Sequence, residues 1–282
     1  MSGFTLGGLL ADATRRLSGL SDTPRLDAEL LLAQALPRSR AHLLAWPERV
    51  PTSEQAARFS AWLERRLAGE PVAYLLGRRE FWSLELAVTP DTLIPRPETE
   101  LLVELALARL PAEGPVAVAD LGTGSGAIAL ALAVERPLAR IVATDLSPSA
   151  LVIARANAGR LGVANVEFRQ GDWCAPLSGE RFQLIASNPP YVAMADPRWR
   201  SGELRFEPAE ALVAGDDGLD ALRAIIARAP ERLSPGGWLL LEHGYDQGEA
   251  VPALLRQRGF VELSDHRDTA GVSRCACGRW PG

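Results

Sequence analysis

The chain has 282 residues, of which 47% are hydrophobic and 23% are charged, and its formal net charge is -5. This composition is typical of a globular protein with a sizeable core, and the acidic balance argues against a general polyanion binder. All 30 basic residues are arginine, which excludes chemistry that needs a lysine, such as a Schiff base or a phosphate-loop lysine.

The 3 cysteines and 3 histidines have no spacing typical of a zinc site. Cys275 and Cys277 form C-x-C and Cys174 stands alone, so we expect free thiols in a reducing compartment and no bound metal. The first residues do not have the pattern of a secretion signal, and no long apolar run is present. We therefore expect a cytoplasmic protein without a membrane segment.

Helical periodicity without strand signals covers residues 1–75, which we expect to form a small helical bundle. Pro24 suits the first turn of one helix, and Ser39 can cap a second, shorter one. A longer amphipathic helix begins at Thr52 or Ser53. The bundle is either a packing appendage or a domain that grips a macromolecular partner. We interpret it as a substrate-recognition domain.

Residues 76–100 differ in character and predict a β-hairpin linker between two domains. Residues 81–88 alternate like a strand, and prolines near the end of the segment favour extended backbone before them. Glu98 and Glu100 then fall in the first turn of the next helix, where negative charge is favourable.

Residues 101–282 show alternating strand and helix patterns, which indicate a parallel α/β domain. Its first strand ends at Asp120 and leads into a glycine-rich turn, whose glycines permit positive φ and close approach of the backbone to a ligand. We predict that the turn binds a cofactor through Gly122, Thr123, Gly124, Ser125 and Gly126.

Asp145 ends the next strand, where a carboxylate can accept hydrogen bonds from ribose hydroxyls. Two cofactors fit, a nicotinamide dinucleotide and S-adenosylmethionine. The G-x-G-x-G spacing favours the second, and Asp120 suits the ammonium of a methionine moiety but would repel a pyrophosphate. After the third strand, Asp172 and Trp173 can flank the edge and the face of an adenine; otherwise Trp173 is a core residue.

Residues 182–187 predict a buried strand that leads into Asn188, Pro189, Pro190 and Tyr191. Two consecutive prolines fix φ and lack N–H donors, so the chain leaves the sheet abruptly, at the edge where α/β sheets bind ligands. The Asn188 side-chain oxygen and the Pro189 carbonyl can accept both hydrogens of a planar NH2 group while Tyr191 packs against it. We therefore predict that Asn188, Pro189 and Tyr191 are catalytic and that all four residues bind substrate. The alternative is a proline-rich turn.

These segments together resemble the protein-(glutamine-N5) methyltransferases of peptide chain release factors, the HemK/PrmC family, over nearly the whole chain. The Asn-Pro-Pro-Tyr motif is shared with methyltransferases of adenine or cytosine amino groups, whereas residues 94–100 and 205–208 are more specific. The matching segments are residues 81–84, 93–100, 120–126, 171–173, 187–191, 205–208 and 240–244.

The resemblance implies a Rossmann-like, seven-stranded class I methyltransferase sheet with an antiparallel last strand, preceded by the helical domain. It implies that S-adenosylmethionine lies against residues 122–126, Asp145, Trp173 and Asn188. It also implies methylation of the glutamine of the Gly-Gly-Gln loop in class 1 release factors, which supports translation termination. Residues 268–274 depart from the family pattern of the final hairpin.

Two other functions stay open, a DNA or RNA adenine-N6 amino-methyltransferase and a cofactor-binding module without activity. We expect a monomer that binds neither membranes nor nucleic acid directly. His243 follows the fifth strand and is interpreted as structural rather than as a general base. Arg205 and Glu207 are expected to shape or close the substrate entrance.

Overall fold

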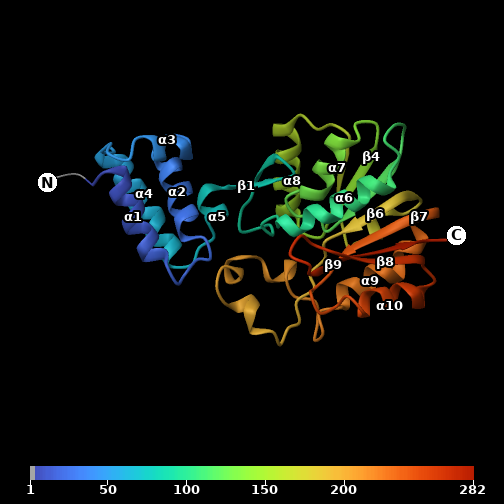
Figure 1. Ribbon diagram of the computed structural model, residues 1–282. Helices are drawn as coiled ribbons and strands as arrows, with labels where there is room; N and C mark the ends of the chain where they lie inside the picture. The colour runs from blue at the N-terminus through green and yellow to red at the C-terminus, as the bar shows by residue number, and fades with distance from the viewer. Residues whose placement is uncertain (1–3) are drawn as a thin grey trace. The chain divides into compact units, whose positions relative to one another are not determined.

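The computed structural model describes residues 4–282 and contains two compact units, one that ends at Gly77 and one from Arg78 to Gly282. Figure 1 shows the first unit as helices only and the second as a sheet covered by helices. Each unit has its own hydrophobic core. Among the described residues, every helix is too short or too polar to cross a bilayer.

The first unit follows the predicted helical pattern. Pro24 begins the second helix, and the side chain of Ser39 caps the third. The fourth helix begins with a capping box, in which Thr52 and Gln55 bond to each other's backbone N–H at 3.2 and 3.0 Å. The helices are α1 Leu6–Leu17, α2 Pro24–Ala35, α3 Arg40–Ala45, α4 Ser53–Leu67 and α5 Val72–Leu76.

A buried ion pair joins two helices of this unit. The Arg66 guanidinium on α4 donates to Asp27 Oδ2 on α2 over 2.8 Å, and both side chains are almost fully buried. The hydroxyls of Ser21 and Thr23 also donate to Asp27. Breaking such a pair by removing one partner leaves an uncompensated buried charge, so it fixes the packing of these helices.

A β-hairpin opens the second unit, with β1 at Arg78–Phe81 and β2 at Leu84–Ala87. Trp82 and Ser83 form its turn with φ of 51° and 57°, the left-handed pair that matches the twist of a two-residue hairpin. The prediction that residues 81–88 alternate as one continuous strand was therefore wrong, because a turn at Trp82 and Ser83 divides them between two short strands. A bulky residue at positive φ is uncommon, so no local pattern in the sequence indicates this turn.

The main sheet has seven strands in the order β5-β4-β3-β6-β7-β9-β8. Strands β3 to β7 are parallel, and β9 runs antiparallel to both of its neighbours. The predicted fold class is confirmed. The strands are β3 Ala117–Leu121, β4 Arg140–Asp145, β5 Val166–Gln170, β6 Phe182–Ser187, β7 Leu233–Glu242, β8 Val261–Arg267 and β9 Ser273–Arg279.

Helices cover both faces of this sheet, with α6, α7 and α8 on one face and α9 and α10 on the other (Figure 1). Successive residues of β3 point to opposite faces, since Val118 belongs to one core and Ala119 to the other. The helices are α6 Glu100–Arg109, α7 Ala127–Glu135, α8 Pro148–Leu161, α9 Asp220–Arg228 and α10 Ala250–Arg258. Short 3-10 turns are η1 Pro97–Thr99, η2 Ala175–Leu177, η3 Pro197–Arg200, η4 Leu204–Phe206, η5 Ala209–Ala211 and η6 Ala229–Glu231.

Candidate active site

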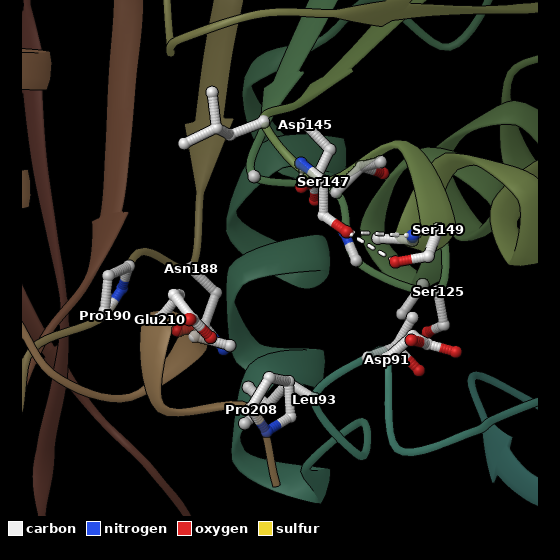
Figure 2. Close-up of a pocket in the computed structure, with 18 of the residues that line it drawn as sticks. Asp91, Leu93, Ser125, Asp145, Ser147, Ser149, Asn188, Pro190, Pro208 and Glu210 are labelled. Carbon is white, nitrogen blue, oxygen red and sulfur yellow. Dashed lines mark hydrogen bonds between the residues drawn. The ribbon is translucent and has the colours of Figure 1, made fainter.

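A cavity of about 490 Å³ lies at the carboxyl ends of β3, β4, β5 and β6, where ligands bind in open α/β sheets. Its volume is in the range of small-molecule sites. Figure 2 shows Asn188 and Pro190 on one side of this cavity and Ser125 and Asp91 on the other. The predicted residues that line it are Gly122, Thr123, Gly124, Ser125, Asp145, Asp172, Trp173, Asn188 and Pro190.

The glycine-rich turn is held over the end of β4. The backbone N–H groups of Gly122 and Thr123 donate to Thr144 O over 2.8 and 2.9 Å. Gly122 has φ of 71°, and a Cβ atom there would lie 3.0 Å from the Trp173 ring. Glycine is therefore required at this position both for the backbone conformation and for the close packing of the indole.

Asp145 is fixed with one bond to each carboxylate oxygen. Oδ2 accepts from Gly124 N over 2.8 Å and Oδ1 from Ser147 N over 2.9 Å. Burial raises the pKa of the Asp145 carboxyl, and these backbone bonds lower it. Each oxygen accepts only one of these bonds and can accept another, so the carboxylate can receive a pair of hydroxyls at the cavity edge.

The sequence predicted that Asp120 contacts the ammonium of a methionine moiety, but the Asp120 side chain lies outside the cavity. Its side chain is fully buried beneath the turn and is not part of the cavity wall. Oδ2 accepts from Thr123 Oγ1 over 2.6 Å and from Ala129 N over 3.2 Å, whereas Oδ1 is buried without a hydrogen-bond partner. Burial raises the pKa of Asp120 to about 7. The carboxyl therefore organises the turn from below.

Gly126 also lies outside the cavity wall. It has φ of 88° and caps the start of α7. The turn is held from behind by Asn157 of α8, which is fully buried. Its Nδ2 donates to Ser125 O over 2.9 Å and to Ala87 O over 3.0 Å, and its Oδ1 accepts from Ala87 N over 2.7 Å. One amide thus joins the glycine-rich turn to the edge of the hairpin.

Residues 188–191, here called the diproline corner, present Asn188 to the cavity. Asn188 Nδ2 donates to Thr99 Oγ1 over 3.0 Å, which leaves Oδ1 as the acceptor that is not used in this bond. Just before the corner, Ser187 Oγ donates to Leu121 O over 2.6 Å and ties β6 to β3. Thr99 of η1 therefore orients the Asn188 amide, and the bond between β6 and β3 fixes the backbone from which this amide projects.

Pro189 and Tyr191 do not line this cavity. Pro189 is buried, and the Tyr191 hydroxyl donates to Glu242 Oε1 over 3.2 Å. The predicted packing of the Tyr191 ring on a substrate amide is thus absent from the cavity wall, because the ring turns towards the end of β7. The Tyr191 carbonyl accepts from Gln247 Nε2 over 3.1 Å.

His243 is fully buried behind the corner and is not on the cavity wall. Its Nδ1 lies 2.8 Å from Gly244 O and its Nε2 lies 2.9 Å from Asp265 Oδ1. Both ring nitrogens therefore lie against oxygen atoms of the protein, and neither is directed at the cavity. This geometry favours the structural role.

Glu207 joins the two segments that form the outer part of the wall. Its side chain is fully buried, accepts from Ile94 N over 3.0 Å and forms an ion pair with Arg96. Leu93 and Pro208, the neighbours of these anchor points, both line the cavity. Glu207 therefore shapes the wall without entering the site. Arg205 is not on the wall, and its guanidinium stacks 5.0 Å from the centre of the Phe206 ring.

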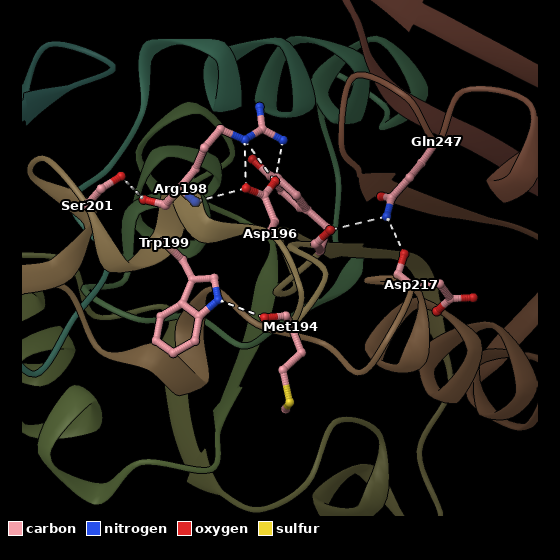
Figure 3. A network of polar contacts seen from close by, with 8 residues as sticks. Met194, Asp196, Arg198, Trp199, Ser201, Asp217 and Gln247 are labelled. Carbon is pink, nitrogen blue, oxygen red and sulfur yellow. Dashed lines mark hydrogen bonds and ion pairs between the residues drawn. The ribbon is translucent and has the colours of Figure 1, made fainter.

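Beyond the corner, the chain makes a long excursion and returns beside Val192, whose N–H donates to Leu212 O over 2.8 Å. Polar contacts hold the excursion in place (Figure 3). Trp199 Nε1 donates to Met194 O over 3.3 Å, and Arg198 Nε donates to Asp196 Oδ2 over 2.8 Å. These contacts are local to a segment that is rich in arginine and aromatic side chains.

Comparison with known proteins gives a consistent result for both units. A model of the PrmC N-terminal domain matches residues 8–77, and a model of the methyltransferase small domain matches residues 98–215. The release factor glutamine methyltransferase of Pseudomonas aeruginosa is 54% identical over 93% of this chain and 96% of its own length. The Escherichia coli protein of the same name is 49% identical over 92% of this chain and 94% of its own.

This chain belongs to the release factor glutamine methyltransferase family. The resemblance noted in the sequence is thereby confirmed. The solved structure of a methyltransferase from Pyrococcus furiosus, at 19% identity, has a TM-score of 0.54 and covers 79% of this chain and 99% of its own. It shows the shared fold, which is that of the S-adenosylmethionine-dependent methyltransferases.

Three residues of the site were missed by sequence reasoning. Asn157 and Thr99 hold the turn and the corner through contacts between residues far apart in the chain. Leu146 is 68% exposed and lines the cavity; an apolar residue directly after the strand-ending Asp145 was the available signal.

Within residues 4–282, no cluster of His, Cys, Asp and Glu is arranged to hold a metal ion.

Proposed function

We propose that this chain transfers a methyl group from S-adenosylmethionine to the side-chain amide nitrogen of the glutamine in the Gly-Gly-Gln loop of class 1 peptide chain release factors. The reaction supports translation termination. The observation that carries the proposal is the Asn188 amide, which Thr99 holds over 3.0 Å at the wall of the cofactor-sized cavity.

The residues of the cavity fit this cofactor. Asp145 offers a carboxylate to the ribose hydroxyls, the glycine-rich turn allows close approach, and Trp173 and Leu146 supply an indole and an exposed apolar side chain for the adenine. When bound, S-adenosylmethionine supplies an electrophilic methyl group on a positively charged sulfur. Asp120 would act on it only through the turn, because its carboxyl is buried below.

Orientation is the main task of the protein in this reaction. A carboxamide nitrogen is a poor nucleophile because its lone pair is delocalised into the carbonyl. Asn188 Oδ1 accepts one amide hydrogen of the substrate and aims the nitrogen at the methyl group. The Pro189 carbonyl, although outside the wall of the cofactor cavity, is proposed as the acceptor of the second hydrogen. The nitrogen gains one methyl, and one of its protons leaves to solvent. Placement of this kind contributes on the order of 7–11 kcal/mol to lowering a barrier.

Recognition of the release factor is assigned to the helical N-terminal domain, residues 1–75, with residues 76–100 as the connecting segment. The first compact unit ends at Gly77, and the hairpin belongs to the second unit. A model of the PrmC N-terminal domain matches residues 8–77. We propose a cytoplasmic monomer that binds the protein substrate rather than nucleic acid.

Mass spectrometry of the substrate tests this function. The chain and S-adenosylmethionine are incubated separately with a purified class 1 release factor, with DNA and with RNA. We expect one added methyl group on the glutamine of the Gly-Gly-Gln loop and none on nucleic acid. A release factor with that glutamine replaced by asparagine is the matched control. Methylation of adenine in DNA or RNA, with an unmodified release factor, would overturn the proposal.

A further inference from the structure

A buried carboxyl lies behind the diproline corner and has no role in the chemistry described above. Glu242 is the last residue of β7 and is 1% exposed. Ser187 of β6 is in register with Leu241 of β7. Asn188 and Glu242 directly follow this pair, so they occupy matching positions at the carboxyl edge of neighbouring parallel strands.

The two oxygens of Glu242 have different surroundings. Oε1 accepts from the Tyr191 hydroxyl over 3.2 Å, whereas Oε2 is buried and has no hydrogen-bond partner among the described residues. Buried polar atoms are nearly always paired, so an unpaired carboxylate oxygen is a feature that requires an explanation. Thr99, which is 4% exposed, lies beside the same carboxyl, and its hydroxyl lowers the pKa of Glu242, as the Tyr191 hydroxyl does, without completing a hydrogen bond to Oε2.

We propose that Glu242 is a positioning residue for methyl transfer, because its carboxylate draws the Thr99 and Tyr191 hydroxyl protons towards itself and so fixes the orientation of Asn188. This inference rests on the proposed function. A threonine hydroxyl has one proton and two lone pairs. When that proton points at Glu242, Thr99 Oγ1 can only accept from Asn188, which donates through Nδ2 over 3.0 Å. The oxygen of Asn188 is then directed to the substrate.

Protonation of Glu242 removes the preferred direction of the Thr99 hydroxyl. A protonated carboxyl donates a hydrogen bond, so it competes for the lone pairs of the Thr99 hydroxyl and no longer holds Asn188 in a single orientation. The neutral form therefore aligns the substrate less well than the ionised form.

The groups around Glu242 bring the pKa of its carboxyl near neutrality. Burial is the largest influence and raises the pKa of Glu242 to about 7; Thr99, Tyr191 and the charge of Arg274 on β9 lower it, and Glu98 on η1 raises it. Cys275 on β9 faces it as a neutral thiol, because burial raises the pKa of that thiol strongly. The value of kcat/KM should thus decrease as the pH falls through about 7, since kcat/KM reports groups of the free enzyme, and kcat should also decrease at acid pH because the protonated carboxyl aligns the substrate less well.

The decisive experiment measures kcat against pH for the full-length wild type and for Glu242→Gln, with release factor and S-adenosylmethionine both saturating. The glutamine has the shape of the glutamate but does not titrate. We expect kcat to fall by about tenfold or more at neutral pH, and the decrease of kcat at acid pH to disappear. The dissociation constant of S-adenosylmethionine and the circular dichroism spectrum should not change.

Two sets of variants isolate the role of the carboxyl. Glu262→Gln makes the same substitution at an exposed ion pair with Arg279 on the surface of β8 and β9, and should keep the wild-type pH profile. Thr99→Ser keeps a hydroxyl and should retain more activity than Thr99→Val. In a double-mutant cycle, Thr99→Val and Glu242→Gln should be non-additive, because both act through the same hydroxyl.

The outcomes separate this inference from the proposed function. If wild type methylates the release factor, and Glu242→Gln has the same kcat and the same decrease of kcat at acid pH, the positioning role is overturned and the function stands. A Glu242→Gln variant that loses cofactor affinity or its native spectrum together with kcat indicates a role in the fold and also overturns it. If wild type methylates no release factor, both proposals fail.

Discussion

The carbonyl oxygen of Tyr191 lies 2.3 Å from the position that a Cβ atom would occupy at Gly218, which has φ of 74°. The same carbonyl accepts from Gln247 Nε2 over 3.1 Å. The last residue of the diproline corner is therefore packed directly against a backbone that tolerates no side chain. The rigidity of the corner depends on this contact as well as on its two prolines.

Gly218→Ala should displace the corner, because the added methyl meets a backbone atom that cannot rotate away and the alanine must adopt a left-handed conformation. We expect a loss of roughly 1–3 kcal/mol in the free energy of unfolding and a lower kcat, both measured on the same preparation. Gly114→Ala is a matched control, since it also has positive φ but no atom within 4 Å of its Cβ position. Equal effects of the two substitutions would refute the role of packing at Gly218.

Asn188→Ala should lower kcat with little change in cofactor affinity. The substitution removes the acceptor of one substrate hydrogen, which costs roughly 1–3 kcal/mol before any loss of alignment. Steady-state kinetics and calorimetry with S-adenosylmethionine measure the two effects separately. Asn165→Ala, at the amino-terminal edge of the sheet, also removes a partly buried amide that bonds to backbone carbonyls and should leave kcat unchanged. Near-normal turnover of Asn188→Ala would contradict the assignment.

The stability of the protein should depend on the charge of Asp120. Burial raises its pKa from 3.8 to about 7 in the folded state. The folded protein therefore binds this proton more tightly than the unfolded chain, and stability is lost as the pH rises from about 4 to about 7. Asp120→Asn does not titrate, so its stability relative to wild type should increase over this range by on the order of 4 kcal/mol and stay constant above it.

Urea denaturation of the cofactor-free protein, at a series of pH values, measures this difference. Asp217→Asn serves as a control, because the hydrogen bonds from Arg223 lower the pKa of that exposed carboxyl. Asp217 is thus ionised in both states at the higher pH values, and its substitution should shift stability equally there. Parallel curves for wild type and Asp120→Asn across the whole range would show that Asp120 is ionised in the folded protein.

Glu207→Ala should loosen the outer wall of the cavity. It leaves the Ile94 N–H and the Arg96 guanidinium without their buried partner, at a cost of roughly 1–3 kcal/mol. We expect faster hydrogen exchange at the Ile94 amide and a higher KM for the release factor. Glu231→Ala removes an exposed carboxylate, 63% accessible, and should change neither. An unchanged KM for Glu207→Ala would exclude its role in shaping the entrance.

Local patterns were sufficient to predict the central part of this fold. The apolar run of β3, the glycines after it and the helix α7 follow each other directly in the chain, and the strand before Asn188 ends where its prolines require. The positions of Asp145 and of the corner at one edge of the sheet then follow from the parallel topology alone.

The contacts that orient the site could not be predicted in this way. Asn188 and its partner Thr99 are 89 residues apart, and Asn157 and Ala87 are 70 apart. Such pairs depend on strand register and on how a helix packs, and neither leaves a periodic signal in the sequence. The direction of the Tyr191 ring and the burial of Asp120 were missed for the same reason, since both are set by neighbouring strands.

A crystal structure of the chain with S-adenosylhomocysteine and a Gly-Gly-Gln peptide most directly tests the role of the diproline corner. We expect the glutamine side-chain nitrogen within hydrogen-bond distance of Asn188 Oδ1, with the cofactor sulfur in line beyond it. A glutamine bound away from Asn188, or a sulfur that points away from the corner, would contradict methyl transfer at this site.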